Sequence, residues 1–162
     1  MWRQMKEQDL KKVHSISLTQ WGTNLYESIE IYQDKFNYYP EGCFVYEENN
    51  RVKGYIIYHI WNLNKIPELN KVLPILEKEE YDCYYIHDIV LEPELRRQGI
   101  GSEIINKILE KDIPISLVAQ VPTQYYWKKY FNFENSNIKC NYGIHLLGGT
   151  VGSPLPPPFQ RT

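Results

Sequence analysis

The sequence of 162 residues has few cysteines and no long apolar run, and both absences narrow what the protein can be. Its three cysteines, Cys43, Cys83 and Cys140, contain no C-x-x-C pair. An odd number is also a poor disulfide framework, so we expect reduced thiols in a cytoplasmic protein. No stretch approaches the roughly 20 apolar residues of a membrane-spanning helix, and residues 1–4 do not lead into the apolar segment of a signal peptide. These absences predict a soluble protein without a membrane partner.

Charge and histidine spacing exclude two further classes of protein. The formal net charge is −2 and no basic stripe is present, so nucleic acid is not an expected partner. The four histidines are dispersed and lack the short spacings of a zinc site, so no metal is expected. A composition that is 43% hydrophobic and 23% charged is typical of a globular protein, and the length suits one domain.

The spacing of apolar residues predicts one domain over residues 1–147 that mixes helices and strands. We expect a short first strand, a helix from about Glu7 and a second helix from Asn24, because Asn24 and Glu27 have the spacing of a capping box. The other expected elements are a hairpin of strands at 43–47 and 52–60, a strand at 81–91, a helix from 99 to about 111, a strand at 115–119, a helix at 123–130 and one or two strands within 138–147.

Residues 148–162 are rich in glycine and proline. This composition predicts an extended or disordered C-terminal tail, which is either plain or a proline-rich ligand for another protein.

The run from Ile89 to Gly101 carries the most specific chemistry, because a strand candidate passes there through a basic, glycine-containing loop into a helix. A helix N-terminus exposes unpaired N–H groups and the positive end of its dipole, and glycines let a phosphate approach the backbone. Ile104 replaces the third glycine of a dinucleotide fingerprint, and Ser102 follows Gly101 without the lysine of a P-loop. The run therefore predicts a pyrophosphate site of a different kind.

The segment Arg96-Arg97-Gln98-Gly99-Ile100-Gly101, preceded by Leu91-Glu92-Pro93, resembles the coenzyme A signature Gln/Arg-x-x-Gly-x-Gly/Ala of the GNAT acetyltransferases. The order of the expected elements agrees with that family over about residues 1–147. The resemblance implies an α/β (α+β) GNAT fold: a central, mixed, mostly antiparallel twisted sheet of about six to seven strands, flanked by about four helices. It also implies acetyl-CoA as cosubstrate and an acyltransferase activity.

By the same resemblance, coenzyme A lies along the strand before the signature loop and at the start of the next helix. Main-chain groups of this strand would hold the pantetheine arm, and the Leu91 N–H would face the thioester oxygen as an oxyanion-hole donor. The N–H groups of residues 97–102 would hold the pyrophosphate. The expected cofactor-binding set is Ile89, Val90, Leu91, Arg96, Arg97, Gln98, Gly99, Ile100, Gly101 and Ser102.

The implied reaction is direct attack of an amine on the thioester, and an amine that is protonated at neutral pH needs a base. His87 is the candidate base by resemblance to family members with two histidines two residues apart, or it is a hydrogen-bonded core histidine. Many members have a glutamate where Tyr85 stands, which this chain lacks. Strand alternation predicts that Tyr85 and His87 share a face and that Asp88 points to the other, in a structural pairing.

The candidate general acid lies in the aromatic segment 125–133. This segment departs from the family pattern Phe-Tyr-x-x-x-Gly-Phe, because Asn132 stands for the glycine and the spacing is one residue longer. The tyrosine of the pattern falls between positions 126 and 128, and we choose Tyr126. Tyr125, or no dedicated acid, remains an alternative.

The sequence does not identify the acceptor amine. Carboxylates of the second helix and of the loop after the hairpin either attract a cationic amine or form a solvated surface; they are Glu27, Glu30, Asp34 and Glu68. His59 and Trp61 either line the acceptor pocket or pack in the core. The alternatives to amine acetylation are a non-catalytic acyl-CoA-binding sensor or interaction module, and transfer of a longer acyl group. Family members are often monomers or dimers, so we expect a monomer or a homodimer.

Overall fold

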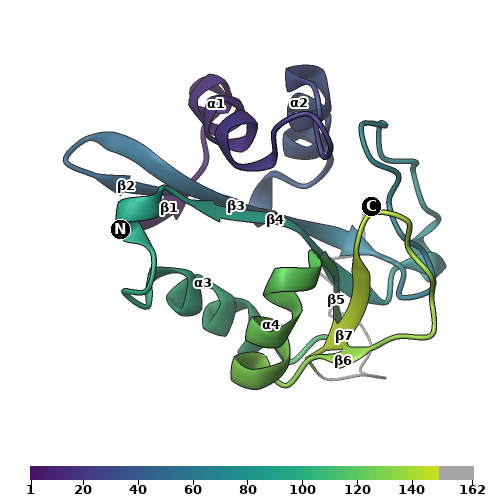
Figure 1. The fold of residues 1–162 in the computed structure, drawn as a ribbon. Coiled ribbons are helices and arrows are strands. Elements are labelled where there is room, and N and C mark those ends of the chain that lie inside the picture. Colours follow the sequence, from purple (N-terminus) through teal and green to yellow (C-terminus); the bar gives the residue numbers. More distant parts are fainter. Residues whose placement is uncertain (150–162) are drawn as a thin grey trace.

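A single twisted sheet of seven strands organises the computed structural model, which describes residues 1–149 (Figure 1). The strands lie in the order β1-β2-β3-β4-β5-β7-β6, and each neighbouring pair is antiparallel except β4 with β5. Their bounds are β1 (Trp2–Gln4), β2 (Cys43–Glu48), β3 (Arg51–Trp61), β4 (Cys83–Leu91), β5 (Ile115–Ala119), β6 (Glu134–Asn135) and β7 (Ile144–Gly148). This mixed, mostly antiparallel sheet confirms the predicted fold class.

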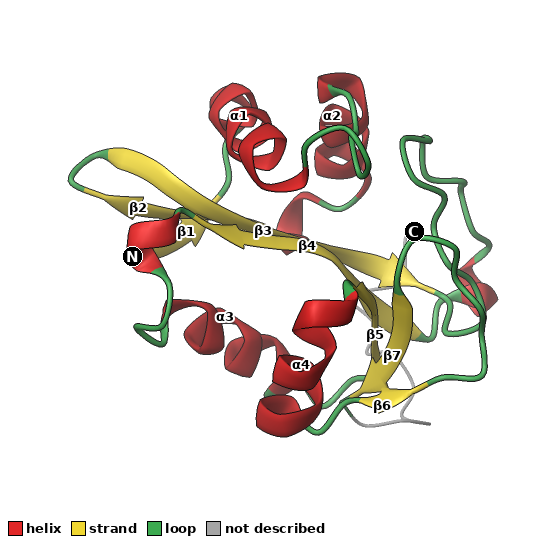
Figure 2. Ribbon diagram, viewed as in Figure 1, coloured by secondary structure: helices red, strands yellow, loops and turns green. Residues whose placement is uncertain are grey.

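Within the described residues four α-helices cover the sheet, α1 and α2 on one face and α3 and α4 on the other (Figure 2). They are α1 (Leu10–Trp21), α2 (Ile29–Tyr38), α3 (Ile100–Leu109) and α4 (Gln124–Phe131). Two buried clusters fill the interfaces: Val13 of α1 packs with Tyr55, and Ile104 of α3 packs in the larger cluster with Trp127. Among the helices of residues 1–149, none combines the length and apolarity that a membrane crossing requires.

The hairpin of β2 and β3 forms as predicted because its turn has the residues that the geometry needs. Asn49 and Asn50 have φ angles of 51° and 60°, in the left-handed region. Two central residues with positive φ make the type of two-residue turn whose twist matches the flanking strands, and asparagine tolerates this conformation better than most residues. The long central strand β3 begins at this turn, and its other edge pairs with β4.

The start of α2 differs from the prediction, and the predicted capping box is wrong. Ser28 is the N-cap of α2, four residues later than Asn24. The Glu27 side chain is only 3% exposed, and it bonds to Lys35 and His87 instead of closing a local cap. Long-range charge partners therefore outweigh the local spacing.

The end of the domain also differs in detail from the prediction. The segment 138–147 contains only β7 from Ile144 onward, and its partner β6 lies earlier, at Glu134–Asn135. β7 ends at Gly148, one residue past the predicted domain boundary. The proline-rich part of the predicted tail, residues 150–162, lies outside the described residues.

Candidate active site

The two central parallel strands, β4 and β5, separate along their length, and this separation creates the site. β4 pairs with β3 along its full length, from Cys83 to Leu91. It pairs with β5 only through the three residues Tyr84–Ile86. Figure 2 shows the two strands diverging beyond that point. From His87 onward, β4 therefore has no strand on its β5 side among the described residues.

The free edge of β4 presents backbone groups of alternate residues. The Glu92 N–H donates to the Lys53 carbonyl at 2.9 Å, so Glu92 faces β3. In an antiparallel ladder every second residue bonds to the same neighbour, so Val90 also faces β3. Ile89 and Leu91 then point their backbone groups toward the space that β5 leaves. Of the three expected strand contacts, Val90 differs: its side chain is buried in the core below α1 and α2.

A β-bulge in the same stretch corrects the expected direction of Asp88. Ile57 pairs with Asp88 and the next residue, Tyr58, pairs with Ile86, so His87 is the extra residue of β4. A bulge breaks simple alternation because two residues oppose one. His87 and Asp88 therefore both contact groups on the α1/α2 side, and the prediction that Asp88 points to the other face is wrong.

The turn before α3 has the geometry expected of an anion site. Arg97 and Gly99 have φ angles of 62° and 79°, and Gly99 is the N-cap of α3. A Cβ built on Gly99 meets nothing within 4 Å, and one built on Gly101 reaches only the edges of Ile89, Leu91 and Tyr126 at 3.8 to 3.9 Å. The turn thus leaves room beside free N–H groups at a helix start.

The arginine side chains of this turn are exposed, and Arg96 is held by the protein. Its Nε donates to the Leu91 carbonyl at 3.0 Å, and its guanidinium donates to the side-chain oxygen of Gln20 at 2.6 Å. Gln98 donates to the Glu94 carbonyl at 2.7 Å. These bonds hold the side chains of Arg96 and Gln98 against the turn.

A cavity of about 230 Å³ lies where β4 and β5 part. His87 and Asp88 line it together with Glu27 from the α1–α2 loop, and Tyr126 and Trp127 of α4 line it from the other face of the sheet. The cavity therefore joins the two faces. Ile89 is among its lining residues and Leu91 is not.

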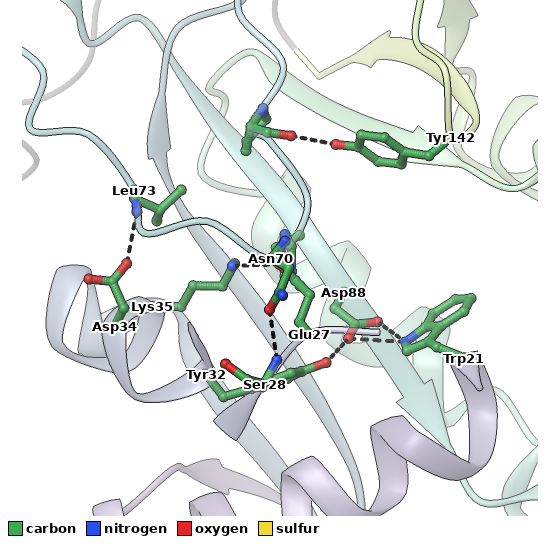
Figure 3. Close-up of polar contacts among 12 residues, drawn as sticks. Trp21, Glu27, Ser28, Tyr32, Asp34, Lys35, Asn70, Leu73, Asp88 and Tyr142 are labelled. Carbon is green, nitrogen blue, oxygen red and sulfur yellow. Dashed lines mark hydrogen bonds and ion pairs between the residues drawn. The ribbon is translucent and has the colours of Figure 1, made fainter. Parts of the chain in front are cut away.

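A wider groove of about 880 Å³ adjoins the cavity and shares Leu69 and Tyr142 with it. The groove lies between the loop after β3 and the loop before β7, and the Tyr142 hydroxyl joins the two by donating to the Pro67 carbonyl at 2.6 Å (Figure 3). Glu68 and Lys139 both line it, so it carries one charge of each sign.

His87 forms a close polar contact with Glu27, which also lines the cavity. Its Nε2 lies 2.5 Å from Oε1 of Glu27, while the buried Nδ1 has no hydrogen-bond partner among residues 1–149. Oε2 of Glu27 accepts from Nζ of Lys35 at 3.2 Å and from the Asn70 N–H at 2.8 Å (Figure 3). Burial opposes ionisation of Glu27, but the charges of His87 and Lys35 and these hydrogen bonds outweigh it and lower the pKa of Glu27.

Asp88 is buried and accepts hydrogen bonds from three side chains. The donors are the Trp21 indole at 3.1 Å, the Tyr32 hydroxyl at 3.1 Å and the Tyr55 hydroxyl (Figure 3). Burial nevertheless raises the pKa of Asp88, with the charge of His87 and the Tyr55 bond acting against it. The bonds tie α1 and α2 to the sheet beside the cavity, which matches the structural pairing expected for Asp88.

Tyr126 is the tyrosine of α4 that faces the cofactor side. Its hydroxyl lies 3.3 Å from the Ser102 hydroxyl at the start of α3. Tyr125 is 65% exposed and points elsewhere. Asn132 ends α4 in the left-handed conformation with φ of 57°, which explains why asparagine substitutes for the glycine of the family pattern.

Several other candidates do not meet the cavity. His59 and Trp61 are fully buried, and neither is among its lining residues. Burial lowers the pKa of His59 to about 3, as expected for a neutral core histidine. Asp34 accepts a hydrogen bond from the Leu73 N–H at 2.8 Å, and Glu30 is exposed on α2. The sequence interpretation had treated Glu27 as one surface carboxylate among four, and no local pattern reveals its contact with His87, 60 residues away.

The parted sheet, the turn with left-handed residues and the helix start place a free strand edge beside a helix N-terminus, an arrangement that suits a long anionic ligand. The chain belongs to the acetyltransferase (GNAT) family, which matches residues 9–113, more than half of the sequence. Members of this family are typically acyltransferases, and acetyl-CoA is the cosubstrate. The residues that the structure describes contain no cluster of three or more metal-ligating side chains.

Solved structures show the same fold at low sequence identity. Ard1 from Thermoplasma volcanium is 17% identical, with 93% of this chain and 97% of that chain covered and a TM-score of 0.67. Naa50 from Arabidopsis thaliana, in complex with the bisubstrate analogue CoA-Ac-MVNAL, is 16% identical over 93% and 97%, with a TM-score of 0.65. The GphF GNAT-like decarboxylase, in complex with isobutyryl-CoA, is 14% identical over 92% and 98%, with a TM-score of 0.65. No curated protein matches the sequence.

Proposed function

We propose that the protein is an N-acetyltransferase that passes the acetyl group of acetyl-CoA directly to a primary amine of a small molecule, peptide or protein. One observation carries this proposal: a histidine with an unpartnered ring nitrogen lies in the same cavity as the free edge of β4 and the tyrosine beside α3. Because the GphF relative is a decarboxylase, the fold alone does not name the reaction, and the proposal rests on this arrangement.

Acetyl-CoA fits the α3 side of the gap between β4 and β5. The free N–H groups at residues 97–102 would hold the pyrophosphate, and the pantetheine arm would run along the backbone of Ile89 and Leu91. The thioester oxygen needs a fixed donor where negative charge develops. The family resemblance points to the Leu91 N–H, whereas the Ile89 N–H has the same orientation on the free edge and belongs to a residue that lines the cavity, so Ile89 would be the donor.

The acceptor amine would enter from the groove through the opening beside Leu69 and Tyr142. An alkylammonium must lose a proton before its nitrogen attacks the carbonyl carbon, and Nδ1 of His87 would take that proton, directly or through water. The new C–N bond forms as the C–S bond breaks, and the Tyr126 hydroxyl would give its proton to the departing sulfur. Holding both substrates in one cavity supplies much of the remaining rate acceleration.

The direct test measures free thiol released from acetyl-CoA with a panel of polyamines, aminoglycosides, amino acids and lysine peptides, beside calorimetric binding of acetyl-CoA. We expect binding and amine-dependent release with at least one acceptor class. Propionyl- and butyryl-CoA in parallel establish the acyl length. Binding without release across the panel would favour the sensor, and absence of binding would contradict the proposal.

Replacing Tyr126 by phenylalanine tests the general acid. We expect kcat to fall about tenfold, less than the usual 10²- to 10⁴-fold general acid–base effect, because coenzyme A thiolate is a good leaving group even without a proton donor. Tyr125→Phe is the matched control, since it removes the same atom from the exposed neighbour. Wild-type kcat in both variants would show that neither Tyr126 nor Tyr125 is the acid.

A further inference from the structure

We propose that Glu27 is a positioning residue for His87: its carboxylate accepts the Nε2 proton and so keeps Nδ1 free to take the proton of the acceptor amine. The inference rests on the proposed base role of His87. Many family members have a glutamate at the position of Tyr85. In this chain the carboxylate would come instead from the loop between α1 and α2.

The two oxygens of Glu27 have separate partners. Oε2 is occupied by Lys35 Nζ and by the Asn70 N–H, at 3.2 and 2.8 Å. Oε1 has a single partner, Nε2 of His87 at 2.5 Å. The bonds from Lys35 and Asn70 to Oε2 hold the carboxylate, and they therefore also fix the position of Oε1. A carboxylate held in this way orients the imidazole ring that it contacts. Hydrogen-bond partners orient other catalytic side chains in the same manner.

Burial makes the contact both strong and costly. The side chains of Lys35, Glu27 and His87 are 1%, 3% and 8% exposed. The charges of His87 and Lys35 and the hydrogen bonds to both oxygens lower the pKa of Glu27 despite its burial, and an ionised carboxylate can only accept a hydrogen bond. The proton of the neutral imidazole must then lie on Nε2, so Nδ1 carries the lone pair.

A purely structural ion pair does not need the free nitrogen. A buried polar atom without a partner loses the hydrogen bond that it makes in water, and natural structures rarely leave one in place. Among the described residues Nδ1 of His87 is such an atom, and unlike the orphaned nitrogens of His59 and His145 it belongs to a residue that lines the cavity. A substrate group or a water at Nδ1 would satisfy it, which is the state that general base catalysis requires.

Other titratable groups near His87 set the background for a pH measurement. The imidazole of His59 lies 6.4 Å away and the phenol ring of Tyr85 lies 6.3 Å away, between ring centres. Asp88 is the next residue of β4, and burial raises its pKa while the charge of His87 acts against this. The groups that face His87 from the packed elements are Glu27, Lys35, His59, Tyr85, Asp88 and Tyr142.

The experiment compares Glu27→Gln with Asp34→Asn. Both substitutions convert a carboxylate that accepts a backbone N–H of the same loop into an amide, and only the first touches His87. We expect Glu27→Gln to lower kcat by about 10- to 100-fold with little change in KM for acetyl-CoA. The carboxylate stabilises imidazolium, so its removal should also move the acidic limb of the kcat profile by about 1 pH unit to lower pH. Asp34→Asn should change neither.

Lys35→Met provides a second variant with the opposite sign. Without Lys35, His87 is the remaining charged partner of the Glu27 carboxylate. The acidic limb of the kcat profile should therefore move to higher pH. If the cluster had only a structural role, the acidic limbs of Glu27→Gln and Lys35→Met would not move in opposite directions. Identical profiles for Glu27→Gln, Lys35→Met and Asp34→Asn would overturn the inference.

Imidazole ¹⁵N spectra of the free protein test the same contact without any turnover. We expect neutral His87 to carry its proton on Nε2 in the wild type and to become a mixture of tautomers in Glu27→Gln. A proton on Nδ1 in the wild type would overturn the inference. If the spectra show the expected tautomer and no amine is acetylated, the proposed function fails while the positioning of His87 by Glu27 stands.

Discussion

Replacing His87 by alanine should lower kcat about 10²- to 10⁴-fold, while the Kd for acetyl-CoA changes by less than about threefold. The first effect is the usual contribution of a positioned general base. The second follows because His87 contacts the acceptor side of the cavity through Glu27, whereas the expected cofactor contacts lie on the free edge of β4 and at α3. Steady-state kinetics and calorimetry on the same preparations measure both quantities.

His145→Gln is the matched control for this prediction. His145 is a buried histidine of β7 that also has one ring nitrogen without a partner, but it does not line the cavity. Its substitution should change thermal stability in a similar way and leave kcat within about twofold, since it lies outside the site. A His87→Ala enzyme with wild-type kcat would remove His87 from the mechanism and restore the reading of a core histidine.

Replacing Gly101 by valine should weaken binding of acetyl-CoA by at least about tenfold, or 1.4 kcal/mol, without unfolding the protein. A Cβ at this position already reaches Ile89, Leu91 and the Tyr126 hydroxyl at ordinary contact distance. The added methyl groups of valine would extend from there into the gap that the pantetheine arm needs. The helix should tolerate the change, because valine costs less than glycine in a helix interior.

Gly101→Ala separates steric exclusion from a general effect on α3. Alanine adds only the Cβ, whose contacts of 3.8 to 3.9 Å are acceptable, and the family signature admits alanine there. Binding of acetyl-CoA should stay within about threefold of the wild type and the melting temperature should not fall. Equal binding by the valine and alanine variants would mean that the cofactor takes another path.

The sequence was sufficient where structure is decided by neighbours in the chain. The signature turn, the hairpin at Asn49 and Asn50 and the apolar face of α3 are local patterns, and the structure confirms the elements that they predict. The GNAT resemblance supplied the mixed, mostly antiparallel sheet, whereas the parallel pairing of β4 with β5 comes from the structure.

The sequence was insufficient where distant groups compete with local preference. Glu27 has the spacing of a capping box, but Lys35 and His87 bind its carboxylate instead. The bulge at His87 depends on how β3 pairs with β4, so strand alternation gave the wrong face for Asp88. The two-residue strand β6 was missed because it is too short to produce any periodicity.

The separation of β4 and β5 also has a mechanical consequence for the whole domain. The described sheet has two parts, one of strands β1 to β4 and one of strands β5, β7 and β6. Only three residue pairs, between β4 and β5, join them. A ligand that bonds to the free edge of β4 and packs against α4 would connect these two parts and restrict their relative motion. Amide hydrogens of β5, β7 and α4 should therefore exchange more slowly with acetyl-CoA bound, as a cooperative unit, while those of the β2–β3 hairpin stay unchanged.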